Sequence, residues 1–218
     1  MKINRFEVVT GTCIEEITGQ SCLGYSVSDT SDFYDVACWP EEEEYPGSTI
    51  TFYDYTNGKI YEPFARECNV MYGKPAFLED AYWILQGNYN SGLVTLYKYF
   101  PSETPEAVTQ LNIADVDPYN LSIMGEKVHI ISEDDEFVCY YPEACRFVKE
   151  SRESACLISD GKVYLSSWTE EGWDDERDCA TPEYRYYEKL VVRDFDGNLI
   201  SEESGCLQMR ADGTWWLA

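Results

Sequence analysis

The stretch Ile158-Ser-Asp-Gly-Lys-Val-Tyr-Leu-Ser166 predicts a β-hairpin. Asp-Gly is favoured at a two-residue hairpin turn because both central residues must adopt positive φ. The residues after the turn are mainly β-branched, aromatic or leucine, which favours a strand. The same pattern occurs at Ile123-Met-Gly-Glu-Lys-Val-His-Ile-Ile131 and at Met209-Arg-Ala-Asp-Gly-Thr-Trp-Trp-Leu217. These hairpins indicate antiparallel β-structure.

Elsewhere in the chain no segment has apolar residues at sustained helical spacing over three turns. Short runs rich in Tyr, Val, Ile, Phe and Trp are instead separated by Gly, Asp, Asn and Pro, which is typical of all-β proteins. We predict strands at Thr49–Tyr55, Lys59–Phe64, Ala81–Gln86, Leu93–Phe100, Lys127–Ser132, Glu136–Tyr141, Lys162–Ser167, Lys189–Phe195 and Thr214–Ala218. The side chains that we expect in the core are Trp83, Ile130, Leu165 and Trp216 or their strand neighbours.

A second hairpin pattern repeats along the whole chain. Its clearest copies are Phe52–Tyr61 and Val192–Ser201, and all copies together begin at residues 6, 52, 96, 138 and 190. Combined with the first pattern, they define five pairs of hairpins if the last pair joins the two ends of the chain. In the earliest pair, the first hairpin has to be Ser21–Val27 with Phe33–Trp39.

Repeats of this length, each with four short antiparallel strands, resemble the blades of a β-propeller. The chain is similar to a small five-bladed β-propeller that occupies residues 1–218 as a single domain. The resemblance implies that Ile3–Ile17 completes a blade by pairing with Cys206–Ala218, and it implies no particular functional family. A β-sandwich is the second possible fold, because short strands with glycine turns suit both architectures. A sandwich does not explain the repeat.

The charge of the chain excludes some classes of partner. It has 16 Lys+Arg against 41 Asp+Glu, a formal net charge of −25. Proteins that bind nucleic acid directly need a basic face, and so do proteins that bind anionic membranes. Because 44% of the residues are hydrophobic, the chain is also unlike a disordered acidic tail.

The nine cysteines do not predict a metal site. None of them forms a C-x-x-C pair, and His129 is the single histidine. We therefore expect no metal and no cofactor. The first residues lack the apolar region of a secretory signal. We expect a cytoplasmic monomer in which most cysteines are small buried residues.

Acidic residues are concentrated in the links between the two hairpins of each repeat. The links at 40–47, 87–92, 133–136 and 169–182 hold 14 acidic residues and one basic residue, Arg177. The propeller resemblance implies that these links lie on one face. The residues that we predict to bind a partner there are Trp39, Glu42, Glu43, Tyr45, Tyr89, Asp134, Asp135, Trp168, Glu171, Trp173, Asp174 and Asp175.

Carboxylates attract a cationic partner, and exposed aromatic rings can hold Lys or Arg by cation–π contact. The sequence thus predicts a non-catalytic binding protein whose partner is a basic protein or peptide, with 169–182 as a mobile binding loop. The competing interpretation is that the acidic links only keep an aromatic-rich protein soluble. The same residues are also compatible with a lectin-like propeller, with a propeller glycoside hydrolase that uses two central carboxylates, and with an acidic nucleic-acid mimic that inhibits a nucleic-acid-binding protein.

Overall fold

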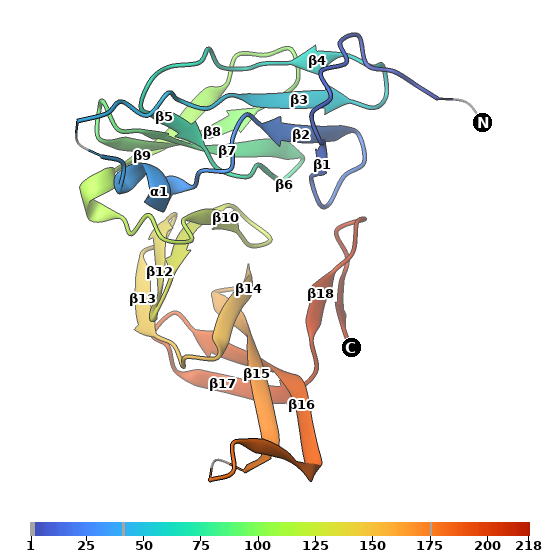
Figure 1. Ribbon diagram of the computed structural model, residues 1–218, viewed down its shortest axis with the longest axis vertical. Helices are drawn as coiled ribbons and strands as arrows, with labels where there is room; N and C mark the ends of the chain where they lie inside the picture. The colour runs from blue at the N-terminus through green and yellow to red at the C-terminus, as the bar shows by residue number, and fades with distance from the viewer. Residues whose placement is uncertain (1–2, 41, 175) are drawn as a thin grey trace.

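The computed structural model describes residues 3–40, 42–174 and 176–218, and regular structure in this part of the chain is almost all β-strand (Figure 1). The exceptions are α1 (Phe33–Ala37) and the 3-10 helix η1 (Ile113–Asp115). The all-β prediction is therefore confirmed. Every pair of neighbouring strands is antiparallel, and each sheet is built from consecutive strands of the chain.

The first two sheets span residues 15–112. The first contains β1 (Glu15–Glu16), β2 (Leu23–Val27), β3 (Ile50–Asp54) and β4 (Ile60–Tyr61), paired in that order. The second contains β5 (Val70–Tyr72), β6 (Ala76–Leu78), β7 (Ala81–Asn88), β8 (Leu93–Tyr99) and β9 (Glu106–Asn112). In the second sheet, β5 and β6 both pair with the long strand β7.

The remaining sheets follow in chain order. The third contains β10 (Ser122–Met124), β11 (His129–Glu133), β12 (Glu136–Tyr141) and β13 (Cys145–Val148). The fourth contains β14 (Glu153–Ser159), β15 (Lys162–Asp174), β16 (Cys179–Asp194) and β17 (Leu199–Ser204). The fifth is a two-stranded hairpin of β18 (Leu207–Met209) and β19 (Trp215–Leu217).

The strand predictions agree with this architecture. Each of the predicted strands overlaps an observed strand. At the deciding hairpin, Asp160 and Gly161 have φ of 48° and 70°, and Ser159 pairs with Lys162. The two-residue turn with positive φ at both positions is thus confirmed.

The segment Phe33–Trp39 is not the strand that the repeat predicted. Residues Phe33–Ala37 form α1, and the Asp32 carboxylate accepts a hydrogen bond of 2.8 Å from the Asp35 N–H. The Asp35 carboxylate accepts one of 3.1 Å from the Asp32 N–H in return. This reciprocal capping satisfies two backbone donors at the helix start and favours a helical turn over a strand.

Three buried clusters join the first four sheets in sequence. One cluster contains Phe52 of the first sheet and Ile84 of the second, and another contains Leu85 of the second and Ile130 of the third. The last contains Ile131 of the third sheet and Leu165 of the fourth. Consecutive sheets thus pack face to face, and Trp83, Ile130 and Leu165 are buried as predicted.

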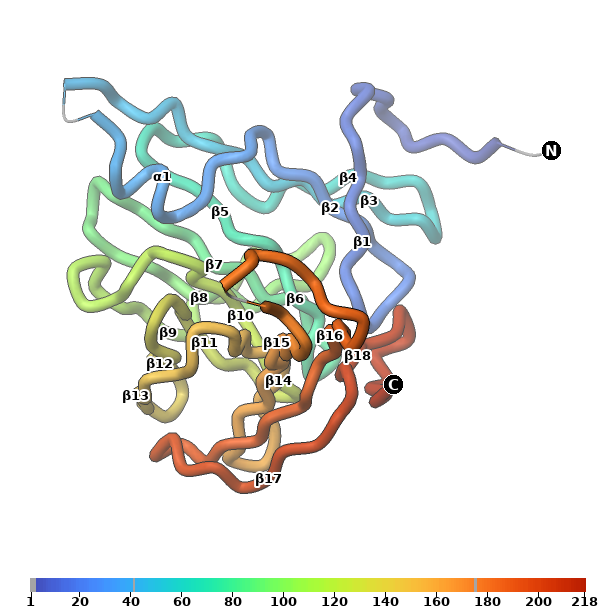
Figure 2. Tube along the Cα trace, turned by 60° about the horizontal axis from the view of Figure 1, so that its bottom comes forward, coloured from blue at the N-terminus to red at the C-terminus, as the bar shows by residue number. Residues whose placement is uncertain are grey.

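The two ends of the chain do not complete a blade by strand pairing. Strand β18 pairs with β19, and β1 pairs with β2. A hydrogen bond of 3.2 Å from the Gly19 N–H to the Ala211 carbonyl brings the terminal hairpin beside the first sheet (Figure 2). Trp216 is 64% exposed, and of its strand neighbours Trp215 is half-buried and Leu217 is 41% exposed. The predicted pairing of Ile3–Ile17 with Cys206–Ala218 and the predicted burial at Trp216 or its neighbours are therefore wrong.

Deletion of residues 207–218 is expected to change the melting temperature little. None of the three buried clusters contains a residue of β18 or β19, so the deletion removes no shared core. Thermal unfolding followed by circular dichroism measures the effect. Leu165→Ala provides the comparison, because truncating a fully buried leucine costs about 2 to 5 kcal/mol. A deletion as destabilising as Leu165→Ala would contradict the expectation.

Candidate functional site

Three of the predicted binding aromatics, Trp39, Tyr45 and Tyr89, pack in or against the core instead. Tyr45 is 2% exposed, and its ring centroid lies 5.1 Å from that of Trp39. The Tyr89 hydroxyl donates a 2.5 Å hydrogen bond to the Phe33 carbonyl at the start of α1. All three pack in or against the cluster between the second and third sheets. Tyr45 in particular cannot present its ring to a partner.

Four of the predicted acidic binding residues, in the first and third links, are at the surface. Glu42, Glu43, Asp134 and Asp135 are exposed. The segments that precede these two links approach one another, because the ring of Tyr34 in α1 lies edge-on to that of Tyr119, with 5.7 Å between centroids. Next to Tyr119, the Asn120 side-chain amide donates a 3.1 Å hydrogen bond to the Glu133 carbonyl and so anchors the third link.

The fourth link is an extension of β15 and β16 and not a loop. Cross-strand pairing continues from Trp168 opposite Glu188 to Asp174 opposite Cys179. We call residues 168–188 the ribbon. It projects from the fourth sheet, away from the first three sheets (Figure 1). Asp175, the remaining predicted binding residue, lies outside the described residues.

A bulge at Gly172 divides the ribbon. Pairing is interrupted between Glu171 and Trp173, and Gly172 has φ of 76°. A side chain at this position would also meet the Glu183 backbone at 2.8 Å. Glycine is therefore required for the two strands to stay close at the bulge.

One face of the ribbon exposes aromatic rings. Trp168, Trp173 and Tyr186 are 40%, 42% and 67% exposed. Glu170 stands directly opposite Tyr186, so a carboxylate lies among the rings. The Trp173 ring lies edge-on to that of Tyr184, with 5.8 Å between centroids. A hydrogen bond to Glu170 raises the pKa of the Tyr184 hydroxyl. This face combines aromatic and acidic groups.

The opposite face of the ribbon is held by its own polar contacts. The Glu171 carboxylate accepts hydrogen bonds of 2.7 Å from both the Tyr187 hydroxyl and the Arg185 Nε. The Arg185 guanidinium also lies 5.4 Å from the centroid of the Tyr187 ring. The hydrogen bonds from Tyr187 and Arg185 lower the pKa of Glu171.

The same arrangement is repeated at the base of the ribbon. The Arg152 guanidinium lies 5.0 Å from the centroid of the Trp168 ring, and its Nη2 is 3.9 Å from a Glu170 oxygen. In both places an aromatic ring and a carboxylate hold one guanidinium group. Beside Trp168 lies a cavity of about 370 Å³ whose wall includes the buried ion pair of Arg193 and Glu153, 2.7 Å apart.

A cavity between the first three sheets does not present free carboxylates. It has a volume of about 580 Å³ and is bordered by Glu15, Asp29, Asp32 and Glu133. Glu15 accepts from the Tyr25 hydroxyl at 2.7 Å, and Asp29 from the Tyr45 hydroxyl at 2.6 Å. Asp32 caps α1, and Glu133 accepts from the Ala155 N–H at 2.9 Å. Each of these acids therefore has a structural hydrogen bond.

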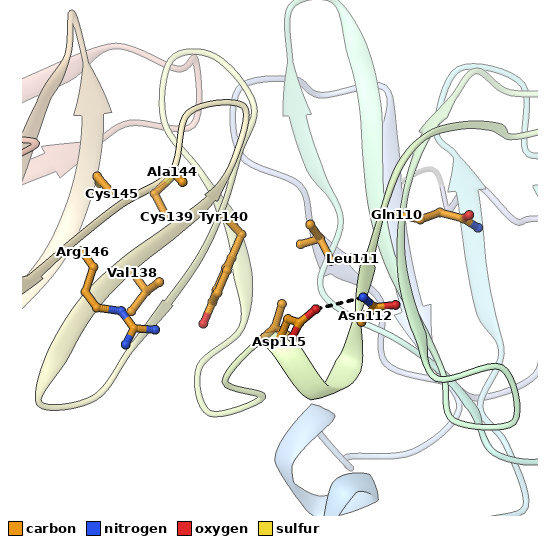
Figure 3. Close-up of a pocket in the computed structure, with 11 residues that line it drawn as sticks. Gln110, Leu111, Asn112, Asp115, Val138, Cys139, Tyr140, Ala144, Cys145 and Arg146 are labelled. Carbon is orange, nitrogen blue, oxygen red and sulfur yellow. Dashed lines mark hydrogen bonds between the residues drawn. The ribbon is translucent and has the colours of Figure 1, made fainter.

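A further cavity of about 530 Å³ lies between the second and third sheets (Figure 3). Asp115 and Asn112, joined by a 2.9 Å hydrogen bond, border one side of it. Tyr140 and Arg146 of the third sheet border the other. Cysteine burial differs from the sequence expectation, because Cys139 alone is fully buried and five of the nine cysteines are exposed.

No protein-family model, curated protein or solved structure matches this chain. In the described part of the chain no helix is long and apolar enough to cross a membrane. The same residues contain no group of three or more His, Cys, Asp or Glu side chains suited to holding a metal ion. A function has to be inferred from the side chains of the chain itself.

The pKa of Glu171 is expected below its ordinary value of 4.5, and Tyr187→Phe is expected to raise it. Because folding lowers this pKa, the contribution of Glu171 to ribbon stability is present above 4.5 and is lost as the pH falls through the lowered value. Carboxyl NMR titration measures the pKa of Glu171 in the unmodified chain and in the Tyr187→Phe variant. Tyr186→Phe is the matched control, because Tyr186 lies on the other face. Equal shifts in the two variants would contradict the assigned hydrogen bond.

Proposed function

We propose that this chain is a non-catalytic binding protein whose ribbon takes arginine side chains of a basic protein or peptide. The observation that carries the proposal is that the ribbon already binds guanidinium groups of its own chain. Arg152 lies on Trp168 beside Glu170, and Arg185 lies on Tyr187 beside Glu171. An arginine from a partner would meet the same chemistry.

The site that we assign to the partner is the aromatic face around Trp173 and Tyr186. Both rings are substantially exposed, and Glu170, directly opposite Tyr186, places a carboxylate beside them. Within the described residues, no lysine or arginine lies over either ring, unlike Trp168 and Tyr187. A guanidinium placed there would gain a cation–π contact and a nearby carboxylate together.

Charge supports a cationic partner. The ribbon sequence, residues 168–188, has eight acidic residues and two arginines, in a chain of net charge −25. Such an excess accelerates the approach of a basic partner, and salt reduces the effect. Individual contacts at an exposed site are weak, about 0.5 to 1 kcal/mol for one cation–π pair. Several arginines are therefore needed for useful affinity.

The scaffold that we propose for this function is propeller-like. The first four sheets would be blades, and the β18–β19 hairpin would be a partial fifth blade. The order of the buried clusters supports this arrangement, because each sheet packs on the next sheet in the chain. A β-ribbon on such a scaffold is held at its base, so its tip needs no core of its own.

Binding of a fluorescent octa-arginine peptide tests the proposal. The peptide is expected to bind the unmodified chain more tightly than octa-lysine does, because guanidinium stacks on aromatic rings better than ammonium. Trp173→Ala and Tyr186→Ala are each expected to weaken octa-arginine binding roughly fivefold, which corresponds to about 1 kcal/mol. Fluorescence anisotropy at low and at physiological salt measures these affinities.

Trp216→Ala is the matched control, because Trp216 is also an exposed tryptophan but lies on the terminal hairpin. It is expected to leave binding unchanged. The melting temperature of each variant is expected to stay near that of the parent, since exposed substitutions usually cost under ~0.5 kcal/mol. If Trp216→Ala weakened binding as much as Trp173→Ala, or if octa-lysine bound as well as octa-arginine, the ribbon site would be wrong.

A further inference from the structure

Two cysteines stand directly opposite each other in the third sheet. In the antiparallel pairing of β12 with β13, Cys139 is the partner of Cys145. Opposed residues in such a pair have Cα atoms about 4.5 to 5.5 Å apart. A disulfide requires a Cα separation of about 4.4 to 6.8 Å. In the strand pairs that the structure describes, this is the one position where cysteine faces cysteine.

The two thiols differ in access. Cys139 is 1% exposed, whereas Cys145 is half-buried. Both thiols face the fourth sheet, because Cys139 belongs to the cluster between the third and fourth sheets and Cys145 packs against it. The alternate residues Tyr140 and Arg146 face the 530 Å³ cavity on the other side of the sheet (Figure 3). A small reagent in solvent therefore reaches the half-buried Cys145 before the buried Cys139.

The interaction between the two thiols favours the same order. Hydrogen bonding to Cys139 lowers the pKa of Cys145, and the corresponding interaction together with burial raises the pKa of Cys139. The nearby acids Glu143 and Asp196 act against ionisation of Cys145. The thiolate is the reactive form of cysteine, so the more accessible thiol is also the one that ionises more readily.

We propose that Cys139 and Cys145 form a reversible disulfide by exchange with a low-molecular-weight disulfide, a thiol switch on the third sheet that is separate from the ribbon. The Cys145 thiolate attacks one sulfur of the small disulfide, whose S–S bond breaks and releases one thiolate. Cys139 then loses its proton to solvent and attacks the Cys145 sulfur. The new Cys139–Cys145 bond forms as the second small thiolate leaves. Two electrons pass from the protein thiols to the small disulfide, which is reduced to two thiols.

The bridge would tie β12 to β13 across the turn of residues 141–144. The ring that it closes contains residues 139–145, which are the two paired cysteines and the turn between them. Because the turn already holds both strands, the bond requires no rearrangement of the sheet. Oxidation would instead convert the two thiols, which face the fourth sheet, into a bridge and make the β12–β13 turn more rigid.

Oxidised glutathione is the probe that we would use on the folded, full-length chain. After incubation, free thiols are alkylated, and the tryptic peptide of residues 128–146, which contains both cysteines, is analysed by mass spectrometry. We expect this peptide to be two hydrogens lighter and to carry no alkyl group. Incubation with excess reduced dithiothreitol is expected to restore two alkylation sites in the same peptide.

Single substitutions separate the role of Cys145, which attacks the small disulfide, from that of Cys139, which completes the bridge. Cys139→Ser is expected to leave glutathione attached to Cys145, because no second thiol can displace it. Cys145→Ser is expected to leave the buried Cys139 unmodified. Cys68→Ser, at an exposed cysteine outside any cysteine pair of the described strands, is expected to leave the bridge intact.

The wild-type peptide decides the proposal even if a variant fails to fold. If exposed cysteines take up glutathione while residues 128–146 keep two free thiols, the proposed disulfide does not form. A bridge from Cys145 to any cysteine other than Cys139 would equally overturn it.

Discussion

The central strands of the second and third sheets lie between two neighbouring sheets, and their side chains are therefore buried on both faces. Successive residues of a strand point to opposite faces of its sheet. In β11, Ile130 belongs to the cluster with the second sheet, and Ile131 belongs to the cluster with the fourth. In β7, Ile84 and Leu85 divide between two clusters in the same way. Burying one such side chain contributes about 1.5 to 3 kcal/mol, so this double burial holds the sheets in chain order.

The fourth sheet ends this series of buried clusters. Its cluster joins it to the third sheet, and no described cluster joins it to the β18–β19 hairpin. Apolar side chains at this end are correspondingly exposed, with Leu199 55% and Ile200 49% accessible. The same absence of a covering sheet explains why β15 and β16 can continue beyond the body of the protein as the ribbon. The two strands of the ribbon are held together by ion pairs, hydrogen bonds and contacts between aromatic rings, and not by a hydrophobic core.

The two sites that we infer use different consequences of this architecture. On the ribbon, side chains are exposed because no sheet covers them, and the rings of Trp173 and Tyr186 are accessible. Within the third sheet, cross-strand register places Cys139 against Cys145, and both face the cluster shared with the fourth sheet. The proposed ribbon site would offer weak, salt-dependent contacts to a large partner. The proposed cysteine pair, buried or half-buried, would admit only a small reagent.

The sequence alone determined the strands and tight turns, because residues such as Asp160 and Gly161 select their conformation locally. It did not reveal α1, since five residues are too few for a helical period, although the Asp32 and Asp35 capping pair was a readable signal. Three aromatic residues stand in or next to acidic links in the sequence, namely Trp39, Tyr45 and Trp173. Only the side chain of Trp173 is exposed. Burial and chain closure depend on which distant segments pack together, and only the tertiary structure decided that.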